Sequence, residues 1–365
     1  MRRPSPPAWL VVGLSALPLV SACASPAHGP PPSQPAAARP TATPPADGPA
    51  AKLAQAGAED RERQACQDRG DDKGALGHAE RALELREAAL GPEDLEVARS
   101  LVRVGALRRR LGEFHDVEAP VKRALPILER ALGADHLEVA RALDTLASVP
   151  LGDRNYDAAE PLLARALEIV RKHPDAWNDL GATLNDQALV LKGQRHPAKA
   201  IPVLEEALRA EEHAWGKDDP HLATVVGNLG ESYRLMRDAV HAEPLLVRAL
   251  ALTEQAYGAD GVKVGSALNN LASLYHYTTN EYAKAEPLYR RALVIYEKRL
   301  GEGHVYTAQL YINLGTLLCA EGDWAQGEPV YAKGMAIFER VLGPSHPEVA
   351  LARSHLEMLR QKRTP

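Results

Sequence analysis

Aromatic side chains are scarce in this sequence, where they make up 5% of 365 residues and include only two phenylalanines. The hydrophobic fraction is nevertheless 45%, which excludes a chain that is disordered throughout. A core of this composition has to be filled mainly by alanine and leucine, and both are good helix formers. The composition therefore favours long helices in close contact.

An excess of one charge is also lacking. Lysine and arginine together number 43 and aspartate and glutamate 48, which gives a formal net charge of −5. A nearly neutral chain has no general attraction for polyanions, so we expect no nucleic-acid partner.

The first apolar run is too short to cross a bilayer. It covers residues 8–20 and follows Arg2 and Arg3, whereas a membrane-spanning helix needs roughly 20 apolar residues. A short apolar run behind basic residues predicts a secretory signal peptide. The run ends in the string V-S-A-C at 20–23, which resembles the lipobox of bacterial lipoproteins.

The lipobox resemblance implies a signal peptide over residues 1–22, cleavage before Cys23, and acylation of the Cys23 thiol and amino group. Several acyl chains anchor a protein stably, whereas a single chain binds a membrane only marginally. In that family an aspartate after the cysteine often marks inner-membrane retention, so Ala24 implies the outer membrane of the bacterial envelope. The alternative is an ordinary signal peptide cut at an alanine, which would leave a soluble periplasmic protein.

Residues 23–50 are rich in proline and carry only two formally charged side chains, Arg39 and Asp47. Such a segment has almost nothing to bury and cannot offset its own ordering entropy. We therefore expect an extended tether between the lipid and the rest of the chain.

The remainder of the chain repeats itself about every 42 residues. The string A-E-P-L-L at 242–246 returns as A-E-P-L-Y at 285–289 and as G-E-P-V-Y at 327–331. A small residue shortly after this string recurs at spacings of 41 to 43: Ala82, Ala124, Ala166, Ala207, Ala249, Ala292 and Gly334. A fixed period in this range indicates a solenoid of stacked repeats.

Each period contains two amphipathic helices, called helix A and helix B below. Helix A has a small residue, its anchor, at one position in every repeat: Gly105, Ala147, Ala188, Gly230, Ala272 and Gly315. Small and apolar residues seven and four places earlier follow the 3.6-residue period, which predicts a buried stripe. Helix B has a proline in its first turn, where the missing N–H costs little, and usually ends at a glycine.

Three strings resemble the 42-residue tetratricopeptide repeats of kinesin light chains. They are L-N-N-L-A-S-L-Y at 268–275, E-Y-A-K-A-E-P-L-Y-R-R-A-L at 281–293 and L-G-P-S-H-P-E-V-A at 342–350. The resemblance implies an all-α fold, a right-handed superhelical solenoid of antiparallel helix pairs.

We expect this array over residues 51–365. Solenoids need capping elements with a polar outer face. The array is therefore predicted to have a degenerate N-terminal cap at 51–92, six repeats at about 93–345 and a C-terminal capping helix at 346–361.

Motifs for metal binding and catalysis are absent from the sequence. His136, His304 and His346 stand singly in equivalent turns, at least one repeat apart, so they cannot converge on one ion as zinc ligands must. No H-E-x-x-H, C-x-x-C, G-x-S-x-G or phosphate-loop pattern occurs. We expect no catalytic residue, no cofactor and no metal.

Cys66 and Cys319 lie about six repeats apart, and repeats touch only their neighbours. An intramolecular disulfide between them is therefore excluded. We predict that both are small apolar fillers of helix A, with a disulfide between two chains as the open alternative.

Polar residues recur on helix A at two offsets that lie four residues apart and therefore share a face. Two places before the anchor stand Arg103, Thr145, Asp186, Asn228, Asn270 and Asn313, and six places before it Arg99, Arg141 and Gln309. In tetratricopeptide arrays the A helices line the concave surface. The resemblance thus implies a lane of these side chains, basic near its start and rich in amides towards its end.

Asparagine offers both a donor and an acceptor, which suits the backbone of an extended peptide. In kinesin light chains the matching asparagine of L-N-N-L-A contributes to a cargo-peptide groove, and this role carries over best to Asn270. The alternatives are that this face is solvated or that the amides tie neighbouring repeats together.

The sequence predicts a membrane-anchored, non-catalytic scaffold that binds a peptide or protein partner in the concave groove. The lipid bilayer is a second expected partner, through acylated Cys23. Two other functions stay open. One is a structural envelope component that assembles through its convex face or its ends, which a large apolar patch would indicate. The other is a sensor or enzyme with a cryptic site, which clustered, strongly perturbed titratable groups would indicate.

Overall fold

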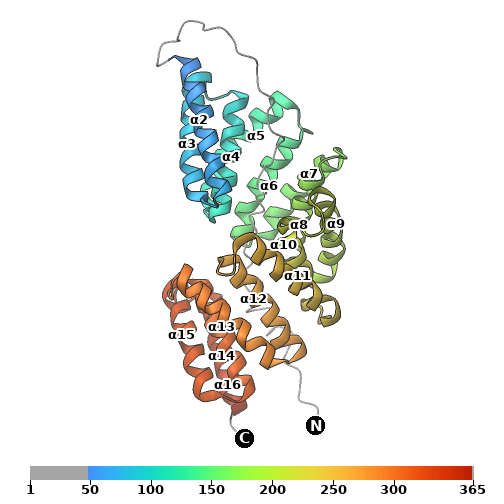
Figure 1. The fold of residues 1–365 in the computed structure, drawn as a ribbon, viewed down its shortest axis with the longest axis vertical. Helices are drawn as coiled ribbons and strands as arrows, with labels where there is room; N and C mark the ends of the chain where they lie inside the picture. The colour runs from blue at the N-terminus through green and yellow to red at the C-terminus, as the bar shows by residue number, and fades with distance from the viewer. Residues whose placement is uncertain (1–47, 364–365) are drawn as a thin grey trace. The chain divides into compact units, whose positions relative to one another are not determined.

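The computed structural model describes residues 48–363, and every regular element in this range is helical (Figure 1). The all-α prediction is therefore confirmed for these residues. The predicted signal peptide, Cys23 and most of the predicted tether lie outside them. No helix in the described range is both long and apolar enough to cross a bilayer.

The described chain divides into two compact units. We call residues 48–194 the N-terminal unit and residues 195–363 the C-terminal unit. The division falls inside the third predicted repeat, between its helix A and its helix B. Nothing in the uniform 42-residue period indicates this division.

The helices of the N-terminal unit pair along the chain. α2 packs against α3, α4 against α5, and α6 against α7, and α8 follows on α7. The bounds are α2 Pro49–Asp68, α3 Asp72–Leu90, α4 Leu95–Leu111, the 3-10 helix η1 Phe114–Asp116, α5 Glu118–Leu132, α6 Leu137–Gly152, α7 Tyr156–Arg171 and α8 Trp177–Gly193.

The C-terminal unit is built in the same way, with the pairs α10–α11, α12–α13 and α14–α15 between α9 and the final helix α16. The bounds are α9 Pro197–Trp215, the 3-10 helix η2 Pro220–Leu222, α10 Ala223–Leu235, α11 Ala239–Tyr257, α12 Val262–Leu274, the π-helix η3 Tyr275–Thr279, α13 Tyr282–Arg299, α14 Val305–Glu321, α15 Trp324–Leu342 and α16 Pro347–Arg363.

These helices lie where the repeat pattern predicts them. The even-numbered helices from α4 to α14 are the six A helices, and the odd-numbered helices from α5 to α15 are the B helices. The segments predicted as caps are helical too, since α2 and α3 precede the first repeat and α16 follows the last. α2 begins at Pro49, two residues before the predicted start of the array.

The predicted stripe of small residues brings helix A against helix B. A side-chain carbon placed at Gly105 would lie 2.5 Å from Cγ2 of Val121, and one at Gly230 would lie 2.9 Å from Cγ of Leu246. At Gly315 the two helix backbones themselves approach closely, because the added carbon would lie 2.6 Å from the backbone nitrogen of Tyr331. The anchors are therefore small because a partner helix occupies the space.

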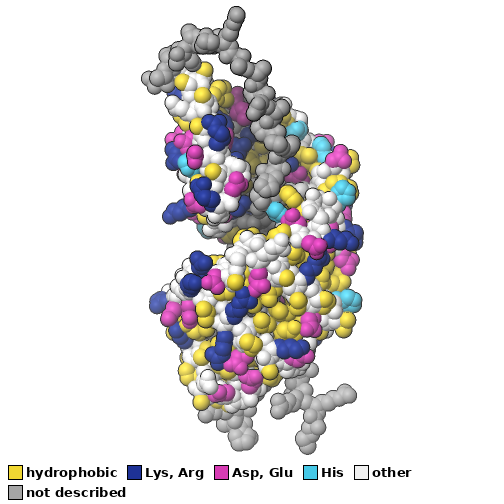
Figure 2. All heavy atoms as spheres, viewed as in Figure 1, with side chains coloured by type: hydrophobic (Ala, Val, Ile, Leu, Met, Phe, Trp, Pro, Cys, Tyr) yellow, Lys and Arg dark blue, Asp and Glu magenta, His cyan; other side chains and the backbone are white. Residues whose placement is uncertain are grey.

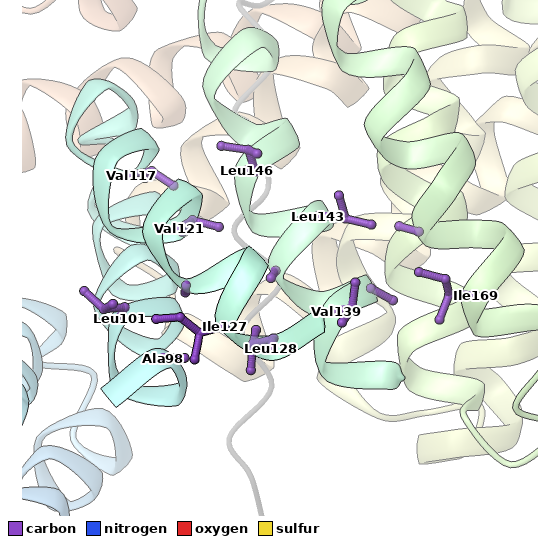
Figure 3. Close-up of a cluster of buried hydrophobic side chains, with 14 of the residues drawn as sticks. Ala98, Leu101, Val117, Val121, Ile127, Leu128, Val139, Leu143, Leu146 and Ile169 are labelled. Atoms are coloured by element: carbon purple, nitrogen blue, oxygen red, sulfur yellow. The ribbon is translucent and has the colours of Figure 1, made fainter. Parts of the chain in front are cut away.

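The larger side chains of the stripe fill the core between these pairs. In the N-terminal unit a cluster of buried aliphatic residues joins α4, α5, α6 and α7, and Figure 3 shows Leu101, Val121, Leu128, Leu143 and Ile169 among them. A comparable cluster in the C-terminal unit joins α11 to α14 and contains Tyr289 and Tyr296. Each unit therefore has apolar clusters of its own.

The three single histidines lie in the turns before A helices, as predicted. Nδ1 of His136 accepts a hydrogen bond from the backbone N–H of Glu138, and His304 accepts one from Tyr306. His346 does the same for the N–H of Glu348. These side chains satisfy amide groups at helix N-termini that have no partner within the helix.

Candidate partner-binding face

The A helices form the inner layer of each unit. α4 contacts α6 and α6 contacts α8, and in the C-terminal unit α10 contacts α12 and α14 contacts α16. Consecutive B helices within a unit have almost no contact with one another. In a curved stack the more closely spaced layer lies on the inside, so polar side chains on the A helices are the candidates for holding a partner.

The three predicted arginines lie in the N-terminal unit, and each is bound to an acidic residue of a neighbouring helix. Arg99 on α4 donates from Nε and Nη2 to the two carboxylate oxygens of Glu138 on α6, both at 2.8 Å. These hydrogen bonds lower the pKa of Glu138. Arg103 reaches Asp60 on α2 at 3.4 Å.

Arg141 repeats this arrangement one helix further along. Its Nε and Nη2 donate to the carboxylate of Asp179 on α8 at 2.7 and 2.9 Å. The basic start of the predicted lane is therefore a ladder of ion pairs between helices. These contacts match the alternative in which polar side chains tie neighbouring repeats together.

Thr145 and Asp186 are buried in the same unit. The Thr145 hydroxyl donates to the backbone carbonyl of Arg141 in its own helix, at 2.8 Å. Asp186 is 2% exposed and accepts a hydrogen bond from Nη2 of Arg109 at 2.5 Å. Arg109 was not among the predicted residues. It stands four places after its anchor, and the same offset holds the polar residues Lys192, Arg234 and His276.

The predicted amides of the C-terminal unit form a hydrogen-bonded chain. Gln309 donates from Nε2 to Oδ1 of Asn313 at 3.1 Å, and Asn313 donates from Nδ2 to Oδ1 of Asn269 on α12 at 2.8 Å. Asn269 was missed by the sequence reasoning, which chose its neighbour Asn270 in the string L-N-N-L-A. Both asparagines are visible in that string, but spacing alone does not say which one faces the next A helix.

Asn228 and Asn270 are both half-buried on A helices of this unit. The side chain of Asn270 forms no hydrogen bond with any residue in the range 48–363. Of the nine predicted residues, it is the one whose amide is most clearly available to another molecule.

A second polar cluster in the C-terminal unit was not predicted. His276 lies in the π-helix η3, stacks on Tyr277 with ring centroids 3.9 Å apart, and meets Tyr289 edge-on at 6.0 Å. Burial lowers the pKa of His276 to about 3, with smaller contributions from His355 and Arg234. The imidazole is therefore neutral at ordinary pH. The polar residue Arg234 at the same offset was the signal in the sequence that could have pointed to it.

Two further features of the described residues bear on their chemistry, the cysteines and the side chains that could bind a metal ion. Cys66 and Cys319 are free and buried, as predicted for small apolar fillers. Between residues 48 and 363, no three side chains of His, Cys, Asp or Glu come together as ligands for a metal ion. Cys23 lies outside this range.

Comparison with known proteins gives a family for this architecture. A model of the tetratricopeptide repeat family matches residues 64–130, 221–298 and 306–363, which together make up more than half of the chain. A search of curated proteins finds no match.

Solved structures with similar folds were also found. Aspartyl phosphate phosphatase F from Bacillus subtilis has a TM-score of 0.58 and 13% identity, over 81% of this chain and 73% of that one. A Rap protein complexed with competence and sporulation factor has a TM-score of 0.53 and 16% identity, over 87% and 99%. A putative kinesin light chain with nearly identical TPR-like repeats from Podosopora anserina has a TM-score of 0.41 and 16% identity, over 57% and 97%. The first two likenesses support the helical repeat fold.

Proposed function

Because the chain belongs to the tetratricopeptide repeat family, we propose that it is a non-catalytic scaffold whose A helices hold a peptide or protein partner. Repeat arrays of stacked helix pairs present extended concave surfaces that suit this task. The Rap protein of similar fold was solved in complex with competence and sporulation factor, which gives one example of such a fold holding a partner.

The observation that carries the proposal is the half-buried amide of Asn270, whose neighbour in the sequence, Asn269, belongs to a hydrogen-bonded chain of amides in the C-terminal unit. Gln309, Asn313 and Asn269 are aligned by their mutual hydrogen bonds, which fixes the direction in which each amide points. Within residues 48–363, the side-chain oxygen of Gln309 and the side-chain nitrogen of Asn269 have no hydrogen-bond partner. Gln309, Asn313 and Asn269 are buried, so it is the half-buried Asn270 that offers a donor and an acceptor to the backbone of an extended segment.

The test is a pull-down from a bacterial envelope extract with the double variant Asn228→Ala/Asn270→Ala. Asn313 is unsuited to this test because it binds Asn269 inside the unit, and its loss would disturb packing. Gln255→Ala is the matched control, since Gln255 is an exposed amide on the B helix α11.

Loss of a specific partner in the double variant, with an unchanged melting temperature and with the partner retained by Gln255→Ala, would support the proposal. A partner bound equally by all three proteins would exclude the amides from its binding site.

We further propose that the array is attached to the outer membrane through acylated Cys23. The support is the lipobox-like string at 20–23, preceded by a short apolar run and two arginines. Intact-mass analysis of the mature protein should show a chain that begins at Cys23 and carries acyl chains, whereas Cys23→Ser should be recovered without them. A mature chain that starts elsewhere would overturn the anchor.

One observation favours a second function, assembly through the B helices. Val240 on α11 is 81% exposed and Val294 on α13 is 62% exposed, and hydrophobic atoms gather on the visible face of the C-terminal unit (Figure 2). Exposed apolar residues on one face mark association surfaces when they are contiguous. Sedimentation over a hundredfold range of concentration would show oligomers if this face assembles, and Val240→Ser/Val294→Ser should then abolish them.

A further inference from the structure

A group of charged side chains links three consecutive A helices of the N-terminal unit. Arg109 on α4 donates from Nη2 to the carboxylate of Asp186 on α8 at 2.5 Å. Its Nη1 donates to the backbone carbonyl of Asp144 on α6, the helix in between, at 3.4 Å. One guanidinium therefore spans the inner layer from the first repeat to the third, and we call this contact the Arg109 clasp.

Asp144 also belongs to this group, and only one of its two carboxyl oxygens has a hydrogen-bond partner. Its Oδ2 accepts a hydrogen bond from the hydroxyl of Thr183 on α8 at 2.7 Å. Its Oδ1 is buried and accepts no hydrogen bond. An ionised carboxylate in this position would be costly, because a buried charge needs a partner for each lone pair that it takes out of water.

Asp144 differs from the neighbouring carboxylates because no cation is paired with it. The charged groups that act on Asp144 are the carboxylates of Asp186 and Asp179 and the guanidinium of Arg109. Asp179 accepts two hydrogen bonds from Arg141, and Asp186 accepts one from Arg109. Asp144 is left without a cation of its own.

The same surroundings disfavour the ionised form of Asp144. Burial is the main cause that raises its pKa to about 7, with further contributions from the charges of Asp186 and Asp179. The Thr183 hydroxyl and Arg109 act in the opposite direction. Burial also raises the pKa of Asp186, while the charge of Arg109 and its hydrogen bond act in the opposite direction.

We propose that Asp144 holds a proton in the folded N-terminal unit and that this proton controls the Arg109 clasp. While Asp144 is neutral, its carboxyl does not compete for Arg109, which binds Asp186 and the backbone carbonyl of Asp144, and α4 is tied to α8 across α6. When the proton leaves, a second carboxylate competes for the same guanidinium and repels Asp186. The contact between α4 and α8 then weakens, and the inner layer of this unit becomes looser.

The direction of the pH effect follows from the raised pKa. The unfolded chain loses the Asp144 proton near its ordinary value of 3.8, whereas the folded chain keeps it up to about 7. This contribution to stability is therefore complete below about pH 4 and is lost as the pH rises to about 7.

The test compares melting temperatures of the full chain and Asp144→Asn between pH 5 and pH 8. Asparagine mimics the protonated carboxyl, so the melting temperature of the variant relative to the wild type should rise by about 3 °C or more between pH 5 and pH 8, because the wild type alone loses stability over this range. Asp175→Asn, which replaces an exposed aspartate in the same unit, should show no such pH-dependent difference. A difference between Asp144→Asn and the wild type that does not grow with pH would overturn the proposal.

A second variant distinguishes the clasp from simple burial of an acid. In Asp186→Asn the competing carboxylate is removed, and Arg109 is free to pair with ionised Asp144. Asp144→Asn should then give no gain at pH 8 in this background. An equal gain in both backgrounds would show that Asp144 acts through burial alone. No partner is needed for either experiment, so their outcome is independent of the proposed scaffold function.

Discussion

The two units share one helical repeat but connect their A helices with different side chains. In the N-terminal unit the connections are ion pairs, Arg99 with Glu138 and Arg141 with Asp179. In the C-terminal unit they are neutral, as in the hydrogen bond between Asn313 and Asn269. The same position of the repeat can therefore carry charge in one unit and amides in the other without a change of fold.

Tyrosine is distributed in the same unequal way. Of the 11 tyrosines, Tyr156 alone belongs to the N-terminal unit. In the C-terminal unit, Tyr289 and Tyr331 are fully buried, and their hydroxyls pair with the Ser273 hydroxyl and the backbone carbonyl of Ala352. Neutral hydrogen bonds and ring packing respond little to salt, whereas partly exposed ion pairs are screened by it. We therefore expect the two units, which share one architecture, to differ in how their stability responds to salt.

The largest expected effect tests how closely the helices approach at the anchors. Gly315→Ala would place a methyl group 2.6 Å from the backbone nitrogen of Tyr331 and 2.8 Å from the carbonyl oxygen of Gly327. Because backbone cannot move without shifting a whole helix, we expect a loss of about 3 kcal/mol of unfolding free energy. Gly105→Ala meets only side-chain methyl groups, those of Val121, Thr145 and Val117, and no backbone, so its loss should be smaller, about 1 kcal/mol.

Urea unfolding followed by circular dichroism measures both changes. Gly227→Ala is the control in the C-terminal unit, since its added carbon would lie 3.6 Å from the Cβ of Ala249, an ordinary contact. It should be neutral or slightly stabilising. Equal losses for Gly315→Ala and Gly105→Ala would contradict the close approach of the two helix backbones at Gly315.

The next expected effect is that stability changes with pH in opposite directions in the two units. Asp144 lowers the stability of the N-terminal unit as the pH rises, whereas His276 lowers that of the C-terminal unit as the pH falls. His276 stays neutral in the folded C-terminal unit down to about pH 3, whereas an exposed histidine of the unfolded chain takes up a proton near 6.5. Stability from this group is therefore present above about 6.5 and is lost as the pH falls towards 3. Between pH 6.5 and 5 we expect a loss of about 2 kcal/mol.

Hydrogen exchange of the α12 and α13 amides at the two pH values measures this loss. His276→Gln removes the titrating group and should flatten the pH dependence, whereas His115→Gln in the N-terminal unit, which replaces an exposed side chain, should leave it unchanged. The hypothesis of a buried neutral His276 fails if His276→Gln shows the same pH dependence as the wild type.

The smallest effect is the coupling across one rung of the ion-pair ladder. Arg99 and Glu138 form two parallel hydrogen bonds but are 33% and 24% exposed, so solvent screens their attraction. A double-mutant cycle with Arg99→Met and Glu138→Gln should give a coupling of about 0.5–1 kcal/mol that shrinks in 1 M NaCl. A coupling that is unchanged by salt would contradict the ion-pair description.

Most of the fold could be predicted from the sequence because the repeat is written into it. Gly105 and Gly230 mark the places where helix A meets helix B, and the structure puts them in contact with Val121 and Leu246. The turn role of His136 could likewise be predicted, since its place in the period is the start of a helix. Local periodicity and contacts between neighbouring elements carry these features, and both can be seen in one sequence.

The candidate site could be predicted only in part. The offsets chosen on helix A identified a face, yet Arg99, Arg141 and Asp186 on that face are bound to other residues of the unit. The partners come from other repeats, 38 to 77 positions away in the chain. An offset within a helix does not show which side chain of the next helix lies opposite.

The sequence by itself determined the period, the helix pairs and the small residues at their contacts, because these depend on spacing along one chain. The tertiary structure alone decided where the array divides into two units, that Asp144 is left without a counter-ion, and which amides pair with one another across helices. These features depend on which groups are brought together across helices, since burial and the nearest charge, more than residue type, set the cost of leaving a polar group unpaired.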